Sequence, residues 1–252
     1  MKNTISPLIS IITVVYNAKD TIEETILSVI NQVFNNFEYI IIDGGSIDNT
    51  LNIIKQYDKK ITTVVSETDN GIYDAINKGI LLSSGEVVGI LNSDDVFTNN
   101  DIISIIADTF RTNYEIDSVI GDIIFINKKG KIHRNYSSKN WSPLKFTWGM
   151  MPPHPTFYCK RNLFHKFGFY RNDLKIAADY ELMMRFLLLH NISFKYIPKI
   201  FVNMSLGGIS TKNIFSNLKI NKEVLYACHL NGVKTNILKI YTKYIFKILE
   251  YI

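Results

Sequence analysis

Short hydrophobic runs alternate with amphipathic stretches along the first 110 residues of the chain. Residues 8–16, LISIITVVY, form a continuous apolar and β-branched run, which is typical of a strand buried on both faces. Residues 21–32 then place apolar side chains along one helical face, and this alternation repeats. The pattern predicts strands over residues 8–16, 37–42, 61–65 and 86–91, and helices over residues 21–32, 48–57, 72–82 and 101–110, with Asp48 as a helix N-cap.

This repeat of strand and helix with short loops predicts an α/β fold, with a mostly parallel, doubly wound sheet covered by helices. After residue 110 the repeat breaks, and Gly207-Gly208 indicates a further boundary. We therefore expect residues 1–110 and 111–211 to be two halves of one domain, and residues 212–252 to be a helical tail. The second half is predicted to hold a strand over 117–126, a hairpin turn at 127–130, an aromatic and proline-rich loop over 137–155, a helix over 177–190 and one or two strands over 194–204.

Polar residues follow three of the four predicted strands of the first half. They are Tyr16-Asn17, the segment DGGS at 43–46 and the segment SDD at 93–95. Parallel strands end at one edge of a sheet, and ligands bind at that edge, near the point where the strand order switches. The sequence therefore predicts a binding site formed by these three segments.

The net charge of +5 lies in the tail of the 252-residue chain. Residues 212–252 contain seven lysines against two glutamates, whereas residues 1–211 contain 21 basic and 21 acidic side chains. A neutral body argues against a nucleic-acid binder, which would carry a basic face. A hydrophobic content of 46% and a charged content of 20% also exclude a disordered chain.

The cysteines and the C-terminal tail indicate where in the cell the protein works. Two cysteines without a CxxC pair indicate a reducing, cytoplasmic setting, and no apolar run is long enough to cross a membrane. Residues 236–252 place Lys239, Lys243 and Lys247 along one helical face. Such a helix suits an anionic membrane surface, and the alternative is that it packs on its own domain or on a dimer partner.

Asp94 and Asp95 are adjacent carboxylates at a predicted strand end. Their mutual repulsion is relieved when a divalent cation joins them, and hard oxygen ligands suit Mg²⁺ or Mn²⁺. A solvated turn that caps the next helix is the alternative. The glycines after Asp43 allow close approach of a ligand to the backbone, and an ordinary loop between strand and helix is the alternative there.

Several motifs in order resemble glycosyltransferase family 2. They are TVVYN (13–17), DGGSIDNT (43–50), ETDNGIYDAINKG (67–79), SGEVVGILNSDD (84–95) and AADYEL (177–182). The resemblance spans roughly residues 5–205 and implies a GT-A fold. It also implies an inverting, metal-dependent transfer of a sugar from a nucleotide-diphosphate donor.

The same resemblance implies roles for single residues. Thr13, Tyr16, Asn17, Asp43 and Asp94 would line the nucleotide site, where Asp43 would bond a base that is typically uracil, and Asp95 would bind the metal. In the segment 67–79, Asp69 and Asn77 would face the same pocket.

Asp179 matches the family's catalytic base, which accepts the proton of the acceptor hydroxyl. The family often has Glu-Asp at this point, whereas this chain has Ala178-Asp179, so Glu181 remains a weaker alternative base. A helix N-cap is the structural alternative for Asp179. His154 would lie on the acceptor or diphosphate side, or would support its loop, and Trp141 and Trp148 would either stack on a sugar or be buried.

The chain lacks the Gln-x-x-Arg-Trp motif of the family's processive members, so the resemblance indicates addition of a single sugar. The expected acceptor is a glycan or a lipid-linked sugar in surface polysaccharide assembly, such as an O-antigen or capsule unit. Two rival functions remain. A sugar-phosphate nucleotidyltransferase would need a glycine-rich basic loop, and residues 13–20 offer only Lys19. A protein that binds nucleotide sugars without turnover would not need the three aspartates.

Overall fold

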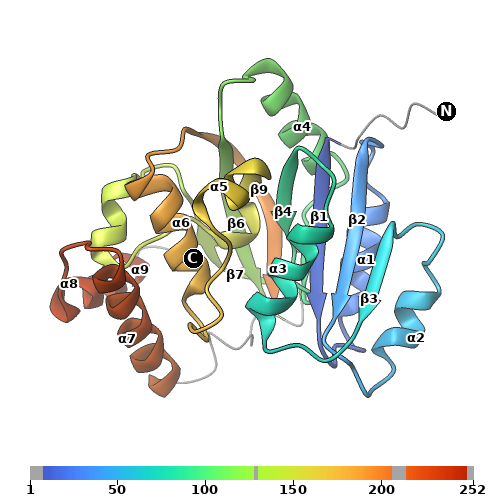
Figure 1. The fold of residues 1–252 in the computed structure, drawn as a ribbon, viewed down its shortest axis with the longest axis horizontal. Helices are drawn as coiled ribbons and strands as arrows, with labels where there is room; N and C mark the ends of the chain where they lie inside the picture. Colours follow the sequence, from blue (N-terminus) through green and yellow to red (C-terminus); the bar gives the residue numbers. More distant parts are fainter. Residues whose placement is uncertain (1–7, 128–129, 206–213, 249–252) are drawn as a thin grey trace.

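The computed structural model describes residues 8–127, 130–205 and 214–248 (Figure 1). Its described strands form a nine-stranded mixed sheet in the order β3-β2-β1-β4-β8-β6-β9-β5, with β7 paired to β6. The strands are β1 (Ile9–Val15), β2 (Phe37–Asp43), β3 (Thr63–Ser66), β4 (Val87–Ile90), β5 (Asp95–Phe97), β6 (Ser118–Ile126), β7 (Ile132–Tyr136), β8 (Tyr158–Lys160) and β9 (Phe194–Ser205).

The first half confirms the predicted alternation of strand and helix. Strands β1, β2, β3 and β4 are parallel, and β1 lies between β2 and β4. The chain thus adds strands on one side of β1 and then crosses to the other side, which creates the expected switch in strand order. The helices here are α1 (Ile22–Ile30), α2 (Thr50–Lys55), α3 (Ile72–Leu82) and α4 (Ile102–Thr112).

Successive side chains of the strands belong to two hydrophobic clusters, one on each face of the sheet. In β1, Ile12 and Val14 join one cluster and Ile11 and Val15 join the other. The first cluster packs under α3, α5 (Asn162–Phe167) and α6 (Ala178–Met184), and the second under α1, α2 and α4. Figure 1 shows α3, α5 and α6 in front of the sheet and α1 behind it. The first four strands are therefore covered on both faces, as their continuous apolar sequences predict.

The second half contains elements that the sequence pattern did not predict. The short strand β8 and the helix α5 (Asn162–Phe167) were not expected, and neither was the short strand β5 of the first half. β7 is the strand that follows the predicted hairpin turn. The loop predicted over 137–155 holds the 3₁₀ helix η1 (Pro143–Trp148) and the start of η2 (His154–Thr156). The helix predicted over 177–190 is α6 (Ala178–Met184) followed by a π-helical turn, η3 (Arg185–Leu189). β8 pairs with β4, so both halves share one sheet. Gly207-Gly208 and residues 128–129 of the expected turn lie outside the described residues.

The C-terminal helices pack on the domain. α7 (Ile214–Leu230) contributes Val224 and Ala227 to the first cluster, and α8 (Ile237–Tyr241) contributes Ile240. Figure 1 shows these helices beside α6 at one end of the molecule. The single helix predicted over 236–252 is instead broken at Thr242, where α9 (Lys243–Ile248) begins. Among the described helices, none has the length and apolar character that would let it cross a bilayer.

Candidate functional site

Asn17 links the end of β1 to the loop after β2. Its backbone N–H donates to Ser46 Oγ at 2.8 Å, and its side-chain Oδ1 accepts from the N–H of Ile47 at 2.9 Å. These two bonds are made with the Asn17 backbone in the left-handed region, with φ of 49°, which asparagine tolerates better than most residues. Asn17 therefore fixes the shape of this part of the sheet edge.

Asp43, the last residue of β2, is fully buried and organises the same loop. Its carboxylate accepts hydrogen bonds from the backbone N–H groups of Gly45 and Ser46 at 3.2 and 3.0 Å. It also accepts from the hydroxyls of Ser46 at 2.5 Å and Ser66 at 2.6 Å. Asp43 thus holds the loop and the start of the segment after β3 together, and its predicted contact with a base stays a prediction.

An exposed aromatic ring lies next to this loop. Tyr16 is 61% exposed, and its ring passes Gly44 so closely that a Cβ there would lie 3.5 Å from it. The same Cβ would lie 2.5 Å from Asp69 Oδ2, so a larger residue at position 44 would displace the Asp69 carboxylate. Gly44 therefore leaves room for the Asp69 carboxylate, and the exposed Tyr16 ring can stack on a planar group.

The structure does not bring Thr13 to this surface. Thr13 is fully buried, and its hydroxyl accepts a hydrogen bond from Tyr39 at 3.1 Å. It follows Ile11 on the face of β1 that contacts the second cluster, so it serves packing.

The predicted N-cap of α2 is one residue away from the observed one. Asn49 takes the N-cap position, and Asp48 accepts from the N–H of Thr50 at 2.9 Å.

Asp94 ends the turn after β4 and Asp95 begins β5, beside the switch in strand order. Asp95 is 1% exposed, and its Oδ2 accepts from Asn92 Nδ2 at 3.1 Å. Burial raises the pKa of Asp94, and it raises the pKa of Asp95 further because the neighbouring Asp94 charge adds to it. The Asp95 carbonyl accepts from the hydroxyl of Thr25 at 2.9 Å, which fixes the backbone of the turn.

These two carboxylates fit a divalent cation that takes its other ligands from a substrate. Two hard, negatively charged oxygen donors in a partly dehydrated turn are the chemistry that Mg²⁺ or Mn²⁺ prefers. In the described part of the chain, no three His, Cys, Asp or Glu side chains gather into a complete metal site. A cation here would need phosphate oxygens or water to complete its coordination.

A second group of side chains surrounds Asp179. The hydroxyl of Tyr73, at the start of α3, donates to the carbonyl of Ile176 at 2.6 Å and lies 3.4 Å from Asp179 Oδ1. The rings of Tyr73 and Tyr170 stack with centroids 5.9 Å apart, and the Tyr170 hydroxyl shares a hydrogen bond of 2.8 Å with His154 Nε2. His154 and Asp179, far apart in sequence, thus belong to one cluster.

Strand pairing places this cluster at the same edge as the paired aspartates. β8 runs antiparallel to β4, with Val88 opposite Cys159, so the residues before β8 lie beyond the carboxyl end of β4. Those residues form η2, which contacts β4 and begins with His154. The Asp94-Asp95 turn leaves that same end of β4. Both predicted parts of the site therefore face one edge of the sheet.

Asp179 is half-buried. Burial raises the pKa of Asp179, and the nearby His154 opposes that shift. Burial also lowers the pKa of His154. Asp179 does not cap α6, because Ala177 takes the N-cap position and Asp179 Oδ1 accepts from the N–H of Tyr180 at 2.7 Å. The helix-cap alternative is therefore wrong.

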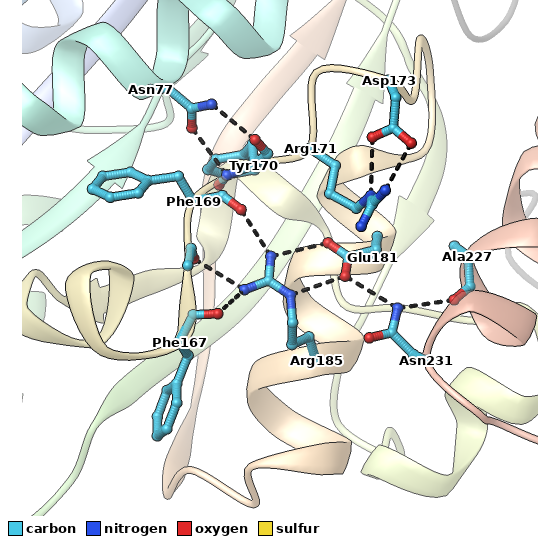
Figure 2. Close-up of polar contacts among 11 residues, drawn as sticks. Asn77, Phe167, Phe169, Tyr170, Arg171, Asp173, Glu181, Arg185, Ala227 and Asn231 are labelled. Carbon is cyan, nitrogen blue, oxygen red and sulfur yellow. Dashed lines mark hydrogen bonds and ion pairs between the residues drawn. The ribbon is translucent and has the colours of Figure 1, made fainter.

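Glu181, the alternative base, is engaged elsewhere (Figure 2). It is 1% exposed, and its carboxylate accepts from Arg185 Nε at 2.9 Å and Nη2 at 3.0 Å. Asn231 Nδ2 donates to the same carboxylate at 3.1 Å. Arg185 also donates to the carbonyls of Phe167, Gly168 and Phe169. Glu181 thus balances the charge of the half-buried Arg185 side chain.

Three further candidate side chains contact other protein groups, and Trp141 follows the alternative in which it is packed within the protein. Asn77 donates to the carbonyl of Tyr170 at 2.8 Å and accepts from its N–H at 2.9 Å, so it holds the Tyr170 segment (Figure 2). Trp141 packs edge-on against Phe146, and Trp148 lies under the Lys239 ammonium at 4.6 Å. Tyr73 lies in the segment 67–79 noted above, but Tyr170 follows no motif and is seen only in the fold.

Comparison of the sequence with known proteins gives one family. The family model of glycosyl transferase family 2 matches residues 10–175. An uncharacterized glycosyltransferase of Mycobacterium tuberculosis is 30% identical over 184 residues, which cover 72% of this chain and 70% of that protein. The chondroitin synthase of Escherichia coli is 31% identical over 222 residues, covering 86% of this chain and 31% of the synthase.

Solved structures show the same fold. S. aureus TarS 1–349 in complex with UDP-GlcNAc gives a TM-score of 0.68 at 18% identity, covering 87% of this chain and 66% of that one. The mannosyltransferase PcManGT from Pyrobaculum calidifontis, in complex with GDP-Man and Mn²⁺, gives 0.66 at 13% identity, covering 92% and 66%. Against the longer TarS structure, the chain spans 39% of its length. At these identities the likeness extends to the fold alone, which is GT-A.

Proposed function

Because the chain belongs to glycosyl transferase family 2 and has the GT-A fold, we propose that it transfers one sugar, with inversion, from a UDP-sugar to a glycan or lipid-linked acceptor. Nucleotide-sugar transfer as such follows from the family; the base, metal and acceptor are proposed. The observation that carries the proposal is the position of Asp179 at the sheet edge that also holds Asp94 and Asp95.

The proposed nucleotide site lies on the β1–β2 side of this edge. The exposed ring of Tyr16 would stack on the base, and the loop held by Asn17 and Asp43 would present its polar backbone to it. The neighbour TarS 1–349 was solved with UDP-GlcNAc, which favours uracil as the base. Thr13 is not included, because its hydroxyl is buried against Tyr39.

Asp95, with Asp94 beside it, would hold Mn²⁺ or Mg²⁺. When bound, such an ion stabilises the negative charge that develops on a leaving diphosphate. Asp95 is already buried and Asp94 is half-buried, so the pair loses less hydration on binding a cation than two exposed carboxylates would. The presence of Mn²⁺ with GDP-Man in the P. calidifontis enzyme supports this proposal.

Asp179 would act as the base of a single displacement. Its carboxylate accepts the proton of the acceptor hydroxyl while the hydroxyl oxygen bonds to the anomeric carbon and the bond to the diphosphate breaks. Burial raises the affinity of Asp179 for that proton, and Tyr73 and His154 hold the surroundings of the carboxylate in place. A single attack from the opposite face inverts the anomeric centre.

A panel of nucleotide sugars tests the proposal. We expect UDP-GlcNAc, or another UDP-sugar, to raise the unfolding temperature of the protein only when Mn²⁺ or Mg²⁺ is present. GDP-mannose is the matched control for the base, and UDP without metal is the control for the ion. Because stabilisation grows with the ratio of ligand to Kd, ligand at about 100 times its Kd would add about 2.7 kcal/mol. Equal stabilisation by every nucleotide sugar, with or without metal, would contradict the site.

We also propose an acceptor class and a cellular location for the enzyme. A relative named for polysaccharide synthesis, the chondroitin synthase, supports a glycan acceptor, and we propose surface polysaccharide assembly of the O-antigen or capsule type. We also propose that the enzyme works on the cytoplasmic face of the membrane. There the basic C-terminal region, with a net charge of +5, would approach lipid-linked acceptors.

The structure leaves fewer side chains available for a membrane contact than the lysine face predicted from the sequence. Lys243 is only 7% exposed, so it is not available to lipid, whereas Leu238 and Ile245 are 77% and 66% exposed. Lys239 lies beside them, over Trp148. Truncation before α7 would remove buried core residues, so point substitutions are the better probe.

We expect the double variant Leu238→Ser, Ile245→Ser to lose flotation with vesicles of one part anionic to two parts neutral lipid, because the exposed apolar side chains provide the insertion energy. Tyr114→Ser, which changes another exposed residue, is the control and should float like the native protein. Flotation of all three to the same extent would remove this surface from the proposal. Sedimentation of the native protein and the double variant would then show whether this surface joins two copies of the chain in a homodimer instead.

A further inference from the structure

Three consecutive backbone N–H groups just before α6 converge on one carboxylate oxygen. The N–H groups of Lys175, Ile176 and Ala177 donate to Glu223 Oε2 at 3.1, 2.7 and 3.0 Å. Glu223 lies on α7, 46 residues beyond Ala177 in the chain. Successive N–H groups in a turn form a concave site for an anion, and here an anion from the C-terminal region fills it.

Glu223 caps the N-terminus of α6, which has no capping side chain of its own. Ala177 is the N-cap residue of α6 and has no side chain that accepts a hydrogen bond. A carboxylate at this end also interacts favourably with the positive end of the helix dipole. Glu223 is itself held in place, because its neighbour Val224 and Ala227, one turn later, are buried in the first cluster.

The segment that Glu223 holds carries the groups that surround Asp179. The carbonyl of Ile176 accepts from Tyr73, and Asp179 follows two residues after Ala177. A second link joins the same elements, because Asn231, just beyond α7, donates to Glu181 on α6 and to the carbonyl of Ala227 on α7 (Figure 2). The first turn of α6 is therefore fixed from α7 at two points.

We propose that Glu223 is a positioning residue for the Asp179 carboxylate, and that α7 is thereby part of the transfer machinery. The inference rests on the proposed function, in which Asp179 is the base. Without Glu223 the turn over 175–177 has three unpaired N–H groups and can change conformation. A shift of the base by about 1 Å is enough to cost up to about 10²-fold in rate.

Two substitutions and a control test the inference. Glu223→Ala removes the acceptor, Glu223→Gln keeps an oxygen acceptor of the same length without charge, and Lys222→Ala changes the exposed neighbour on α7. The readout is release of nucleoside diphosphate, with water as acceptor, from UDP-GlcNAc or GDP-mannose, whichever stabilises the native protein more. Measurements are made well below the unfolding temperature of each variant.

We expect Glu223→Ala to lower kcat by about 10-fold or more, with KM for the donor within about twofold, because donor contacts lie on other elements. Glu223→Gln should recover most of the lost kcat, and Lys222→Ala should match the native enzyme. If Glu223→Ala does not fold, the test uses Glu223→Gln alone, and its kcat should lie measurably below that of the native enzyme with KM for the donor unchanged.

The outcomes separate this inference from the proposed function. Native kcat in both Glu223 variants, while Asp179→Asn is inactive, would overturn the positioning role and leave the base in place. Loss of thermal stability with native kcat would overturn it too, since that result describes a purely structural residue. Native turnover in Asp179→Asn would overturn the assignment of the base, and the role of Glu223 with it.

Discussion

Asp179→Asn is expected to lower the rate of sugar transfer by about 10²-fold or more and to leave the affinity for the donor unchanged. Asparagine keeps the shape of the side chain and its hydrogen bond from the N–H of Tyr180, but it cannot accept the proton of the acceptor. The donor is expected to bind at Tyr16, Asp43 and Asp95, on other elements. Steady-state kinetics and donor-induced thermal stabilisation measure the two quantities separately.

The pH profile gives a second check on Asp179. The base acts only when ionised, and burial raises its pKa above the ordinary aspartate value of about 3.9. We therefore expect kcat to fall as the pH drops through this raised pKa, and to recover as the pH rises. The titratable groups that face the carboxylate are Tyr73, Tyr170 and His154, and His154 opposes the shift when protonated.

The matched control for Asp179 is Asp173→Asn, which removes an exposed carboxylate paired with Arg171 at 2.8 Å in the preceding loop. Exposed ion pairs contribute about 0–1 kcal/mol, so this variant should keep native kcat and stability. Unchanged turnover in Asp179→Asn, or an equal loss in both variants, would refute the role of Asp179 as the base.

Elements with a long hydrophobic pattern were predictable, and short ones were not. β1 and β2 are buried on both faces, so their sequences are continuous apolar runs, and α3 was predicted over the same residues that it occupies. Strands such as β5 and β8 have three residues each, too few for any periodicity to appear. These strands form because longer neighbours, β9 for β5 and β4 and β6 for β8, offer unpaired edges.

The site was predictable where a motif carries it and unpredictable where tertiary contacts create it. The segment that leads into β5 showed its paired aspartates directly. Tyr170 and Glu223 join the surroundings of Asp179 only through their contacts with His154 and with the N–H of Ala177, which the fold creates. Thr13 lies away from its predicted place in the nucleotide site for a different reason. Within a strand buried on both faces, a motif position does not reveal which face a side chain takes, and alternation turned Thr13 toward the core.

Asp95→Asn is expected to abolish the metal-dependent part of donor binding and to lower turnover by about 10²-fold or more, because a bound metal contributes several kcal/mol of charge stabilisation. The fold should not suffer. The native carboxylate is buried beside the Asp94 charge, and the amide can still accept from Asn92, so the unfolding temperature without ligand should be unchanged or higher.

The control for this variant is Asp108→Ala, which removes an exposed carboxylate of α4. A titration of Mn²⁺ at fixed UDP-GlcNAc, followed by thermal stabilisation, should be steep for the native protein and for this control, and flat for Asp95→Asn and the harsher Asp95→Ala. Retained metal-dependent stabilisation in both Asp95 variants would show that the cation is held elsewhere. Equal activity of the native enzyme with and without a chelator would show that transfer needs no metal. A flat titration together with an intact fold would mean that this buried carboxylate, unfavourable in the free protein, is kept for the cation and the diphosphate.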